Sequence, residues 1–193
     1  MWKKSLAERE DSFMRPRFKL LILFIVLISF SGCGYTTGSL LPPHIKNVYV
    51  ESFANNIPIT EEVSDQRIYK TYRPRLEIDI TRAIIDKFIF DGHLKLVQKK
   101  DADVVLSGEL IDFRREPTKY GNDDNVEQYR IAISVDMEFK SIKDNKMLWE
   151  EKGFTGSEDY YTVGSQARSE ESAVADAIDD LARRVVERAI EVW

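Results

Sequence analysis

The chain has 193 residues, a net charge of −5 at pH 7 and a hydrophobic content of 43%. These values are ordinary for one soluble folded domain, and the acidic balance argues against a nucleic acid partner, whose phosphates attract basic surfaces. The single cysteine, Cys33, excludes both an intrachain disulfide and a zinc site built from cysteines.

The amino-terminal segment has the layout of an export signal. An apolar run from Leu20 to Ile28 follows three basic residues and precedes Ser31-Gly32-Cys33. A charged region, an apolar core and small residues at a cleavage site, in this order, predict a signal peptide over residues 1–32. The run is shorter than the roughly 20 apolar residues that cross a bilayer, so we expect it to be removed.

The residues around Cys33 resemble a lipobox, in which small residues give the signal peptidase access to the bond before an acylated cysteine. Phe30 stands where lipoboxes usually carry leucine. Gly34 follows the cysteine in place of the aspartate that retains lipoproteins in the inner membrane. The resemblance implies that Cys33 carries acyl chains such as palmitate and that the lipoprotein is sorted to the outer membrane. Each buried acyl methylene contributes about 0.8 kcal/mol to such an anchor.

The sequence offers two possible starts of translation. The polar stretch from Met1 to Phe13 is unusual before a signal peptide, whereas a start at Met14 gives a conventional basic entry into the apolar run. Both starts stay open.

Residues 33–44 contain glycine, threonine, serine and proline and predict a lipidated tether. Residues 45–193 are then expected to form a single periplasmic domain.

The first predicted elements of this domain are a strand, a loop and a helix. A strand is expected over Ile45–Phe53, followed over Asn55–Arg73 by a mobile loop that is longer than most connections. Pro74 opens a helix whose apolar residues recur at helical spacing through Phe90. Asp91-Gly92 ends this helix.

Four strands and a last helix follow. Residues 93–98 and 103–114 are expected to pair as a hairpin, with Gly108 marking a bulge. Strict alternation over 129–140 predicts a strand with one buried and one polar face. A turn at Asp144-Asn145 leads into the strand 147–154. Ser169 can cap the last helix, which we expect to extend almost to the carboxyl terminus.

The order of strand, helix, four strands and helix predicts an α+β fold. It is a two-layer sandwich with a mostly antiparallel sheet of four to five strands and two helices on one face. We expect one apolar stripe on each helix and therefore no third layer. The other sheet face, with Arg130, Asp136, Glu138 and Lys140, is left for water or a partner.

Candidate catalytic groups are few. Only His44 and His93 could act as a base, one beside the tether and one at a strand start. Adjacent carboxylates such as Asp123-Asp124 face opposite ways on a strand, and no glycine-rich phosphate loop is present. We therefore predict no enzyme, no catalytic residue, no metal and no cofactor other than the acyl chains on Cys33.

Three lysines, Lys140, Lys143 and Lys146, flank the turn after the alternating strand. Lysines at such positions usually keep a sheet edge soluble. Charge-assisted hydrogen bonds to an anionic ligand are the other interpretation. The residues by themselves leave both open.

Short stretches across most of the mature chain resemble the lipopolysaccharide-assembly lipoprotein family. They are Cys33-Gly34-Tyr35, Leu41 to Val50 with Phe53 and Asn55, Arg73 to Glu77, Leu94 to Val97, and Ala102 to Leu110. These are strand and turn patterns without an active-site signature. The segment from Asn55 to Arg73 is longer than in that family.

The resemblance implies a lipoprotein on the periplasmic face of the outer membrane that plugs and supports a large β-barrel translocon. Together they would insert lipopolysaccharide into the outer leaflet. A barrel of many strands encloses an open lumen, which a two-layer domain would fill. The implied partners are the barrel protein and lipopolysaccharide, with Lys140, Lys143 and Lys146 as candidate contacts to the latter.

Two alternatives remain from the sequence. An outer-membrane lipoprotein that regulates a peptidoglycan synthase, or another envelope-assembly machine, would have the same anchor and a similar small domain. The phenotype on depletion separates this regulator from a lipopolysaccharide-assembly lipoprotein. Loss of the assembly lipoprotein leaves lipopolysaccharide in the inner membrane, whereas loss of the regulator weakens the cell wall. A periplasmic hydrolase ranks third because it would depend on His44 and His93 alone.

Overall fold

In the computed structural model, the described residues are 42, 44–57 and 73–191. All of them belong to the compact unit over residues 39–193. The predicted signal peptide, Cys33 and most of the predicted loop, residues 58–72, lie outside the described residues. Within the ranges just given, neither helix combines the length and the apolar character that a bilayer span requires.

Three long antiparallel strands form most of the sheet. They are β4 (Val104–Tyr120), β5 (Val126–Ser141) and β6 (Lys146–Tyr161). The alternation in β5 has the predicted effect, because its apolar side chains point to the core and are at most 1% exposed: Ile131, Ile133, Val135, Met137 and Phe139. All three strands run further than the sequence pattern indicated.

Parallel pairing completes the sheet on the other side of β4. Strand β1 (Asn47–Val50) lies between β3 (Lys95–Leu96) and β4 and is parallel to both. Strand β2 (Ala54–Asn55) also pairs with β4 in parallel. The order is β3-β1-β4-β5-β6, with β2 beside β4, so the sheet is mixed.

The predicted hairpin between residues 93–98 and 103–114 is wrong, because β1 separates the two strands. The amide of Lys95 donates to the carbonyl of Lys46 at 2.8 Å, and the amide of Asp103 donates to the carbonyl of Asn47 at 2.9 Å. A short 3-10 turn, η1 (Lys99–Asp101), carries the chain across β1. The pairing partner of both strands is therefore distant in sequence.

Gly108 has a different role from the predicted bulge. The nearest register shift in β4 falls later, between Leu110 and Asp112. A Cβ atom on Gly108 would lie 2.3 Å from Cε1 of the Phe53 ring. The glycine therefore makes room for Phe53, which is 2% exposed in the core.

Helix α2 (Leu76–Asp91) confirms the predicted helix and its end. Gly92 has a φ of 75° and donates its amide hydrogen to the carbonyl of Phe88 at 3.1 Å. This left-handed cap favours glycine. One face of α2 is buried through Leu76, Ile80, Ile84 and Phe88.

The prediction of a single apolar stripe is wrong for α2. Ile78, Ile89 and Phe90 are also apolar, yet they are 38%, 63% and 89% exposed. None of them lies on the face that packs against the core. The helix therefore presents apolar side chains outside the two-layer core.

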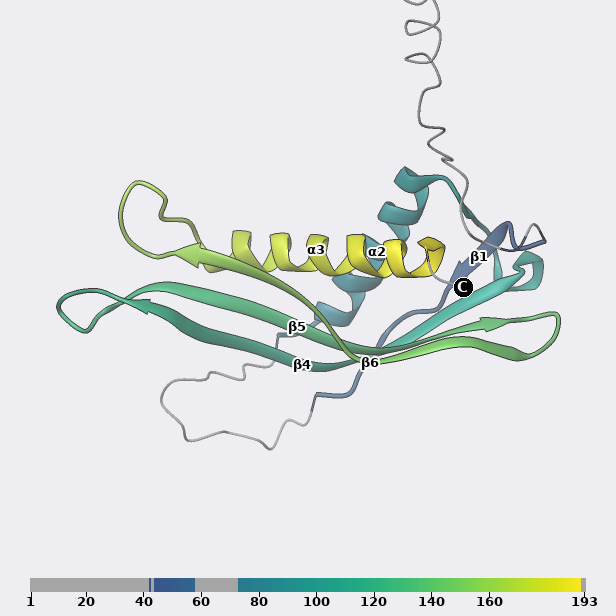
Figure 1. The fold of residues 1–193 in the computed structure, drawn as a ribbon, viewed down its shortest axis with the longest axis horizontal. Helices are drawn as coiled ribbons and strands as arrows, with labels where there is room; N and C mark the ends of the chain where they lie inside the picture. Colours follow the sequence, from purple (N-terminus) through teal and green to yellow (C-terminus); the bar gives the residue numbers. More distant parts are fainter. Residues whose placement is uncertain (1–41, 43, 58–72, 192–193) are drawn as a thin grey trace, which may run out of the picture. The chain divides into compact units, whose positions relative to one another are not determined.

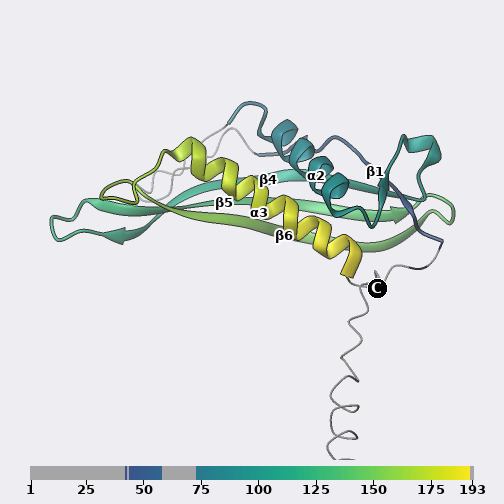
Figure 2. The same cartoon turned by 90° about the horizontal axis from the view of Figure 1, so that it is seen from above.

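Helix α3 (Glu170–Glu191) begins at the predicted cap, since the amide of Ser172 donates to Oγ of Ser169 at 3.2 Å. It crosses β6 and β5 (Figure 2). A Cβ atom on Gly156 of β6 would lie only 2.6 Å from the Cα atom of Leu181. Glycine at this position lets the helix approach the sheet this closely.

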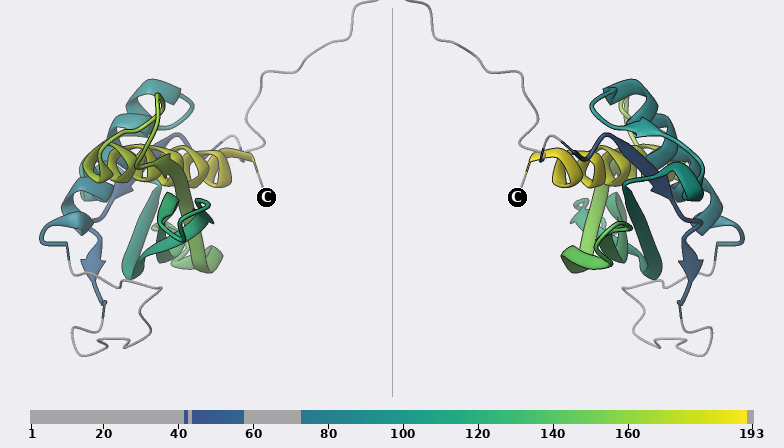
Figure 3. Two further views of the ribbon diagram at one scale, coloured as in Figure 1. Left: turned by 90° about the vertical axis from the view of Figure 1, so that its left-hand side faces the viewer. Right: turned by 90° about the vertical axis from the view of Figure 1, so that its right-hand side faces the viewer.

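The two helices cover one face of the sheet and contact each other (Figures 1 and 3). Lys87 of α2 and Asp179 of α3 form an ion pair at 2.9 Å. The core lies between this helical layer and the inner face of the sheet. The predicted two-layer α+β sandwich is therefore confirmed, with a mixed sheet in place of a mostly antiparallel one.

We predict that Gly156→Ala lowers the free energy of unfolding by about 2–3 kcal/mol, because the added methyl group overpacks the contact with α3. The control is Gly164→Ala, where a Cβ has no atom within 4 Å and only the positive φ of 84° opposes the change. We expect the control to cost about 1 kcal/mol. Urea unfolding measures both, and equal losses would contradict the packing argument.

Candidate functional site

Both candidate histidines, His44 and His93, lie exposed at the surface. His44 lies exposed in a turn before β1. Nδ1 of His93 lies 2.9 Å from Oδ2 of Asp91, so the ring contacts a carboxylate. Among the residues that the structure describes, no group of three or more His, Cys, Asp or Glu side chains could hold a metal ion.

The three predicted lysines divide into two groups. Lys140 lies on β5, and its ammonium pairs with the carboxylate of Glu138 on the same strand. Lys143 lies in the exposed turn between β5 and β6, where Asn145 has a φ of 48°, and Lys146 is the exposed first residue of β6 directly after this turn. The structure therefore brings Lys143 and Lys146 together at a chain reversal and places Lys140 on the polar face of the sheet.

Two apolar side chains that the sequence analysis did not single out flank these lysines. Ile142 is 41% exposed and Met147 is 37% exposed, at either end of the β5–β6 turn. The turn thus presents apolar and cationic side chains side by side. This combination suits an amphiphile that has an anionic head group. The sequence signal was available in the apolar residues that directly adjoin Lys143 and Lys146.

The β5–β6 turn lies at the end of the sheet where β1 begins. The register aligns Val48 with Val104, Val104 with Ser141, and Ser141 with Lys146. We call this end, formed by residues 44–48, 91–103 and 142–147, the tether end. The opposite end, formed by residues 121–125 and 162–171, is called the far end.

The two ends differ in charge. The tether end carries six lysines and four aspartates, whereas the far end carries four carboxylates and one arginine. Asp103 at the tether end accepts hydrogen bonds from the amides of Lys46 and Asn47 at 3.0 and 2.8 Å. Burial favours a higher pKa for Asp103, but these bonds outweigh it and lower the pKa. The domain is thus basic at the tether end although the chain is acidic.

The face of the sheet away from the helices is polar, and its charges are paired. Arg130 binds Asp159 across β5 and β6 at 2.7 Å, and Arg114 contacts Asp112 and Glu116 on β4 at 2.7 and 2.9 Å. Small side chains lie between the charges, since Ser134 and Thr155 share a hydrogen bond of 2.7 Å, and Ala132 is 7% exposed. This polar face offers matched charges rather than an apolar patch.

A cluster around Glu170 closes the core toward the far end. Nη1 of Arg115 lies 2.7 Å from the Glu170 carboxylate, and Nη2 of Arg73 lies 3.1 Å from its other oxygen. The Arg115 guanidinium also lies over the Tyr129 ring, 4.4 Å from its centre. One carboxylate at the start of α3 therefore joins β4 to the residues that precede α2.

The environment of Glu170 shifts its titration. Burial would raise the pKa of this carboxyl, but the hydrogen bonds and charges of Arg115 and Arg73 outweigh burial and lower the pKa below its usual value. Burial also raises the pKa of the neighbouring Tyr160 hydroxyl. Glu170 is thus held ionised, which is the form that pairs with two arginines.

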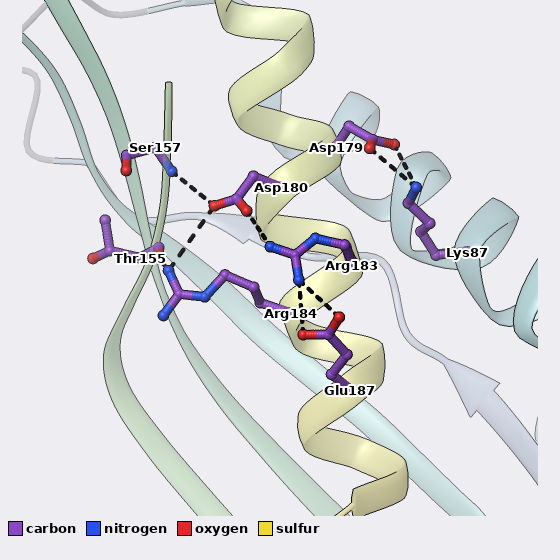
Figure 4. A network of polar contacts seen from close by, with 8 residues as sticks. All are labelled: Lys87, Thr155, Ser157, Asp179, Asp180, Arg183, Arg184 and Glu187. Atoms are coloured by element: carbon purple, nitrogen blue, oxygen red, sulfur yellow. Dashed lines mark hydrogen bonds and ion pairs between the residues drawn. The ribbon is translucent and has the colours of Figure 1, made fainter. Parts of the chain in front are cut away.

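Side chains cover the outer edge of β6. The amide of Ser157 donates to Oδ2 of Asp180 at 3.2 Å, and the carbonyl of Thr155 accepts a hydrogen bond from Arg184 (Figure 4). The carbonyl of Asp159 accepts one from Arg168 at 2.9 Å. These bonds block strand addition along this part of the edge. This stretch of β6 is therefore unsuited to pairing with a partner strand.

Comparison with known proteins gives one family. The sequence model described as LptE, lipopolysaccharide-assembly, matches residues 45–189. No curated protein matches the chain. The match covers nearly all of the described strands and helices.

Several solved structures are similar in outline. Rare lipoprotein B from Shewanella oneidensis is 17% identical, with a TM-score of 0.42, and the match covers 74% of this chain and 93% of the other. A minor lipoprotein from Acinetobacter baumannii is 16% identical, with a TM-score of 0.44 and coverages of 76% and 92%. A hypothetical protein from Chlamydia trachomatis is 13% identical, with a TM-score of 0.49 and coverages of 75% and 95%. These likenesses are too distant to carry a functional argument.

Glu170→Gln tests the Glu170 cluster. Since the pKa of Glu170 is lower in the folded chain, its ion pairs stabilise the fold above its ordinary pKa of 4.5 and are lost as the pH falls through the lower folded pKa. We predict a loss of about 1–3 kcal/mol at neutral pH, which shrinks toward acidic pH, measured by urea unfolding. The control Glu171→Gln, at a side chain that is 78% exposed, should change little, and an equal effect would contradict this role.

Proposed function

Because the chain belongs to the lipopolysaccharide-assembly family, we propose that it is an outer-membrane lipoprotein that plugs and supports a β-barrel translocon for lipopolysaccharide. The observation that carries this proposal is the family match over residues 45–189. Family membership makes the chain an envelope lipoprotein of lipopolysaccharide assembly. The acyl anchor on Cys33, the periplasmic face of the outer membrane and the barrel partner are parts of the proposal.

The polar face of the sheet is an argument for the proposal that the domain plugs the barrel. The lumen of a large outer-membrane barrel is polar, so a domain inside it must present hydrophilic side chains to the wall. Arg114 and Arg130 on this face are each paired with carboxylates, and paired charges cost less to bring against another polar surface than unpaired charges do. The covered stretch of the β6 edge disfavours strand addition at Thr155 and Ser157.

The β5–β6 turn is the proposed contact to lipopolysaccharide. Lys143 and Lys146 are exposed at the turn, and Ile142 and Met147 adjoin them. Anionic groups of the ligand would accept charge-assisted hydrogen bonds from the lysines. Lys140 contributes less in this proposal, because its ammonium already pairs with Glu138.

The alternative of a peptidoglycan-synthase regulator has no comparable support, since the family match is to lipopolysaccharide assembly. The same holds for a hydrolase based on His44 and His93, since the family match is to lipopolysaccharide assembly. In the proposed function, the chain is therefore a non-catalytic protein that binds the barrel and lipopolysaccharide.

We predict that the acylated protein co-purifies with an outer-membrane β-barrel protein after mild detergent extraction. The measurement is affinity capture followed by mass spectrometry of the captured band and of the amino-terminal peptide. Depletion of the protein should leave lipopolysaccharide in the inner membrane. Capture of a peptidoglycan synthase, with no barrel protein, would overturn the proposal in favour of its alternative.

We predict that the double variant Lys143→Glu/Lys146→Glu binds purified lipopolysaccharide at least about tenfold more weakly, because two charge-assisted contacts become repulsive. Lys152→Glu is the control, since its side chain is 75% exposed but lies away from the turn. Calorimetric titration measures binding, and circular dichroism checks the fold. Unchanged binding by the double variant would remove these lysines from the ligand site.

A further inference from the structure

Two adjacent apolar side chains at the end of α2 have no place in the core. Phe90 is 89% exposed and Ile89 is 63% exposed, the highest values among the large hydrophobic residues that the structure describes. Asp91 follows them as the last residue of α2, and Gly92 caps the helix in its left-handed conformation. The pair therefore stands at the tip of α2, outside the two packed layers.

The tip of α2 belongs to the tether end. Lys95 opens β3 next to β1, and its amide donates to the carbonyl of Lys46 at 2.8 Å. Lys95 is the fifth residue after Phe90, which limits the distance between their Cα atoms to about 17 Å. Figure 2 shows α2 running toward the end of the sheet where β1 begins. The chain enters the domain from the tether at this same end, just before His44.

The tether limits how far this end can lie from the anchor. Eleven residues lead from Cys33 to His44, and such a segment spans at most about 40 Å. An acylated Cys33 therefore keeps the tether end near the bilayer that holds its acyl chains. This step rests on the acylation in the proposed function, and the rest of the inference rests on the described residues.

The tether end as a whole carries more lysines than aspartates, a balance that an anionic bilayer attracts, although Asp86 and Asp91 lie close to the apolar pair on α2. Lys46 and Lys95 are exposed beside the start of β1, and lysines near an anionic membrane favour binding. The far end provides the contrast, because Val163 is exposed there and the charged residues of that end are four carboxylates and one arginine. Of the two ends, the tether end is the one whose residues include lysines.

We propose that Ile89 and Phe90 insert into the interfacial region of the anionic phospholipid bilayer that holds the acyl chains, while Lys46 and Lys95 contact its head groups. Exposed aromatic and aliphatic side chains flanked by lysines have this role at membrane surfaces. A second contact, in addition to the acyl anchor, fixes the orientation of the domain. The tether end is thereby held at the face of the bilayer that carries the acyl chains, and the acidic far end stays in an aqueous environment.

Site-directed spin labelling tests this orientation. Phe90→Cys is labelled with a nitroxide in the mature acylated protein, whose Cys33 thiol is blocked, and bound to vesicles of phosphatidylethanolamine and phosphatidylglycerol. We expect residue 90 to be more accessible to oxygen than to a water-soluble nickel complex. Val163→Cys, which replaces an apolar side chain that is 54% exposed at the far end, is the control and should remain aqueous.

The outcomes separate the inference from the function on which it rests. Mass spectrometry that finds no acyl group on Cys33 overturns the anchoring premise and this inference together. An acylated protein that binds vesicles while residue 90 stays aqueous overturns the inference alone. Spin–spin broadening at residue 90 in place of burial in lipid would identify a second copy as the occupant, and this too overturns the inference.

A charge variant tests the lysines separately. Lys46→Glu/Lys95→Glu should lower the oxygen-to-nickel accessibility ratio at residue 90 by about threefold or more, because anionic head groups repel the new carboxylates. Lys152→Glu, at an exposed lysine outside the tether end, is the matched control and should leave the ratio unchanged. A ratio that is equal in both variants would remove Lys46 and Lys95 from the contact.

Discussion

The close approach of α3 to β6 at Gly156 is the constraint on which the other contacts depend. Because no side chain separates Gly156 from the backbone of Leu181, the helix has a fixed height above the sheet. At that height Glu170 reaches Arg115 on β4, and the side chain of Asp180 reaches the amide of Ser157. Packing of this kind is sensitive to a single methyl group.

The domain is polar in two separate ways. On the outer face of the sheet, cations and carboxylates pair within the same surface, as Arg130 does with Asp159. Between the two ends of the sheet, by contrast, the charges are separated, with lysines near the start of β1 and carboxylates near the start of α3. Paired charges make a face compatible with many polar surroundings, whereas separated charges give the domain a direction in an electrostatic field.

Sequence patterns were sufficient where the structure is set by neighbours in the chain. The alternation through β5, the glycine that ends α2 and Ser169 before α3 all depend on local periodicity or capping. The insertion of β1 between β3 and β4 depends on pairing between distant residues, for which one sequence has no signal. Gly108 was misinterpreted for the same reason, since Phe53 lies far from it in sequence.

The candidate site shows the same division. The lysines of the β5–β6 turn could be identified from the turn sequence, but their location at the tether end required the register of β1, β4, β5 and β6. The apolar tip of α2 was missed because Phe90 and Ile89 continue a helix that is apolar on its buried face. Exposure distinguishes the two sets of residues, and exposure is a property of the folded chain.

The covered edge of β6 has a consequence for the order of folding. All three side chains that bond to this edge, Arg168, Asp180 and Arg184, follow β6 in the chain. A polypeptide that crosses a membrane amino terminus first would expose β6 before these groups arrive. Until the last helix docks, the strand is a template for intermolecular pairing. Its escape from aggregation thus depends on Arg168 and on the last helix, α3.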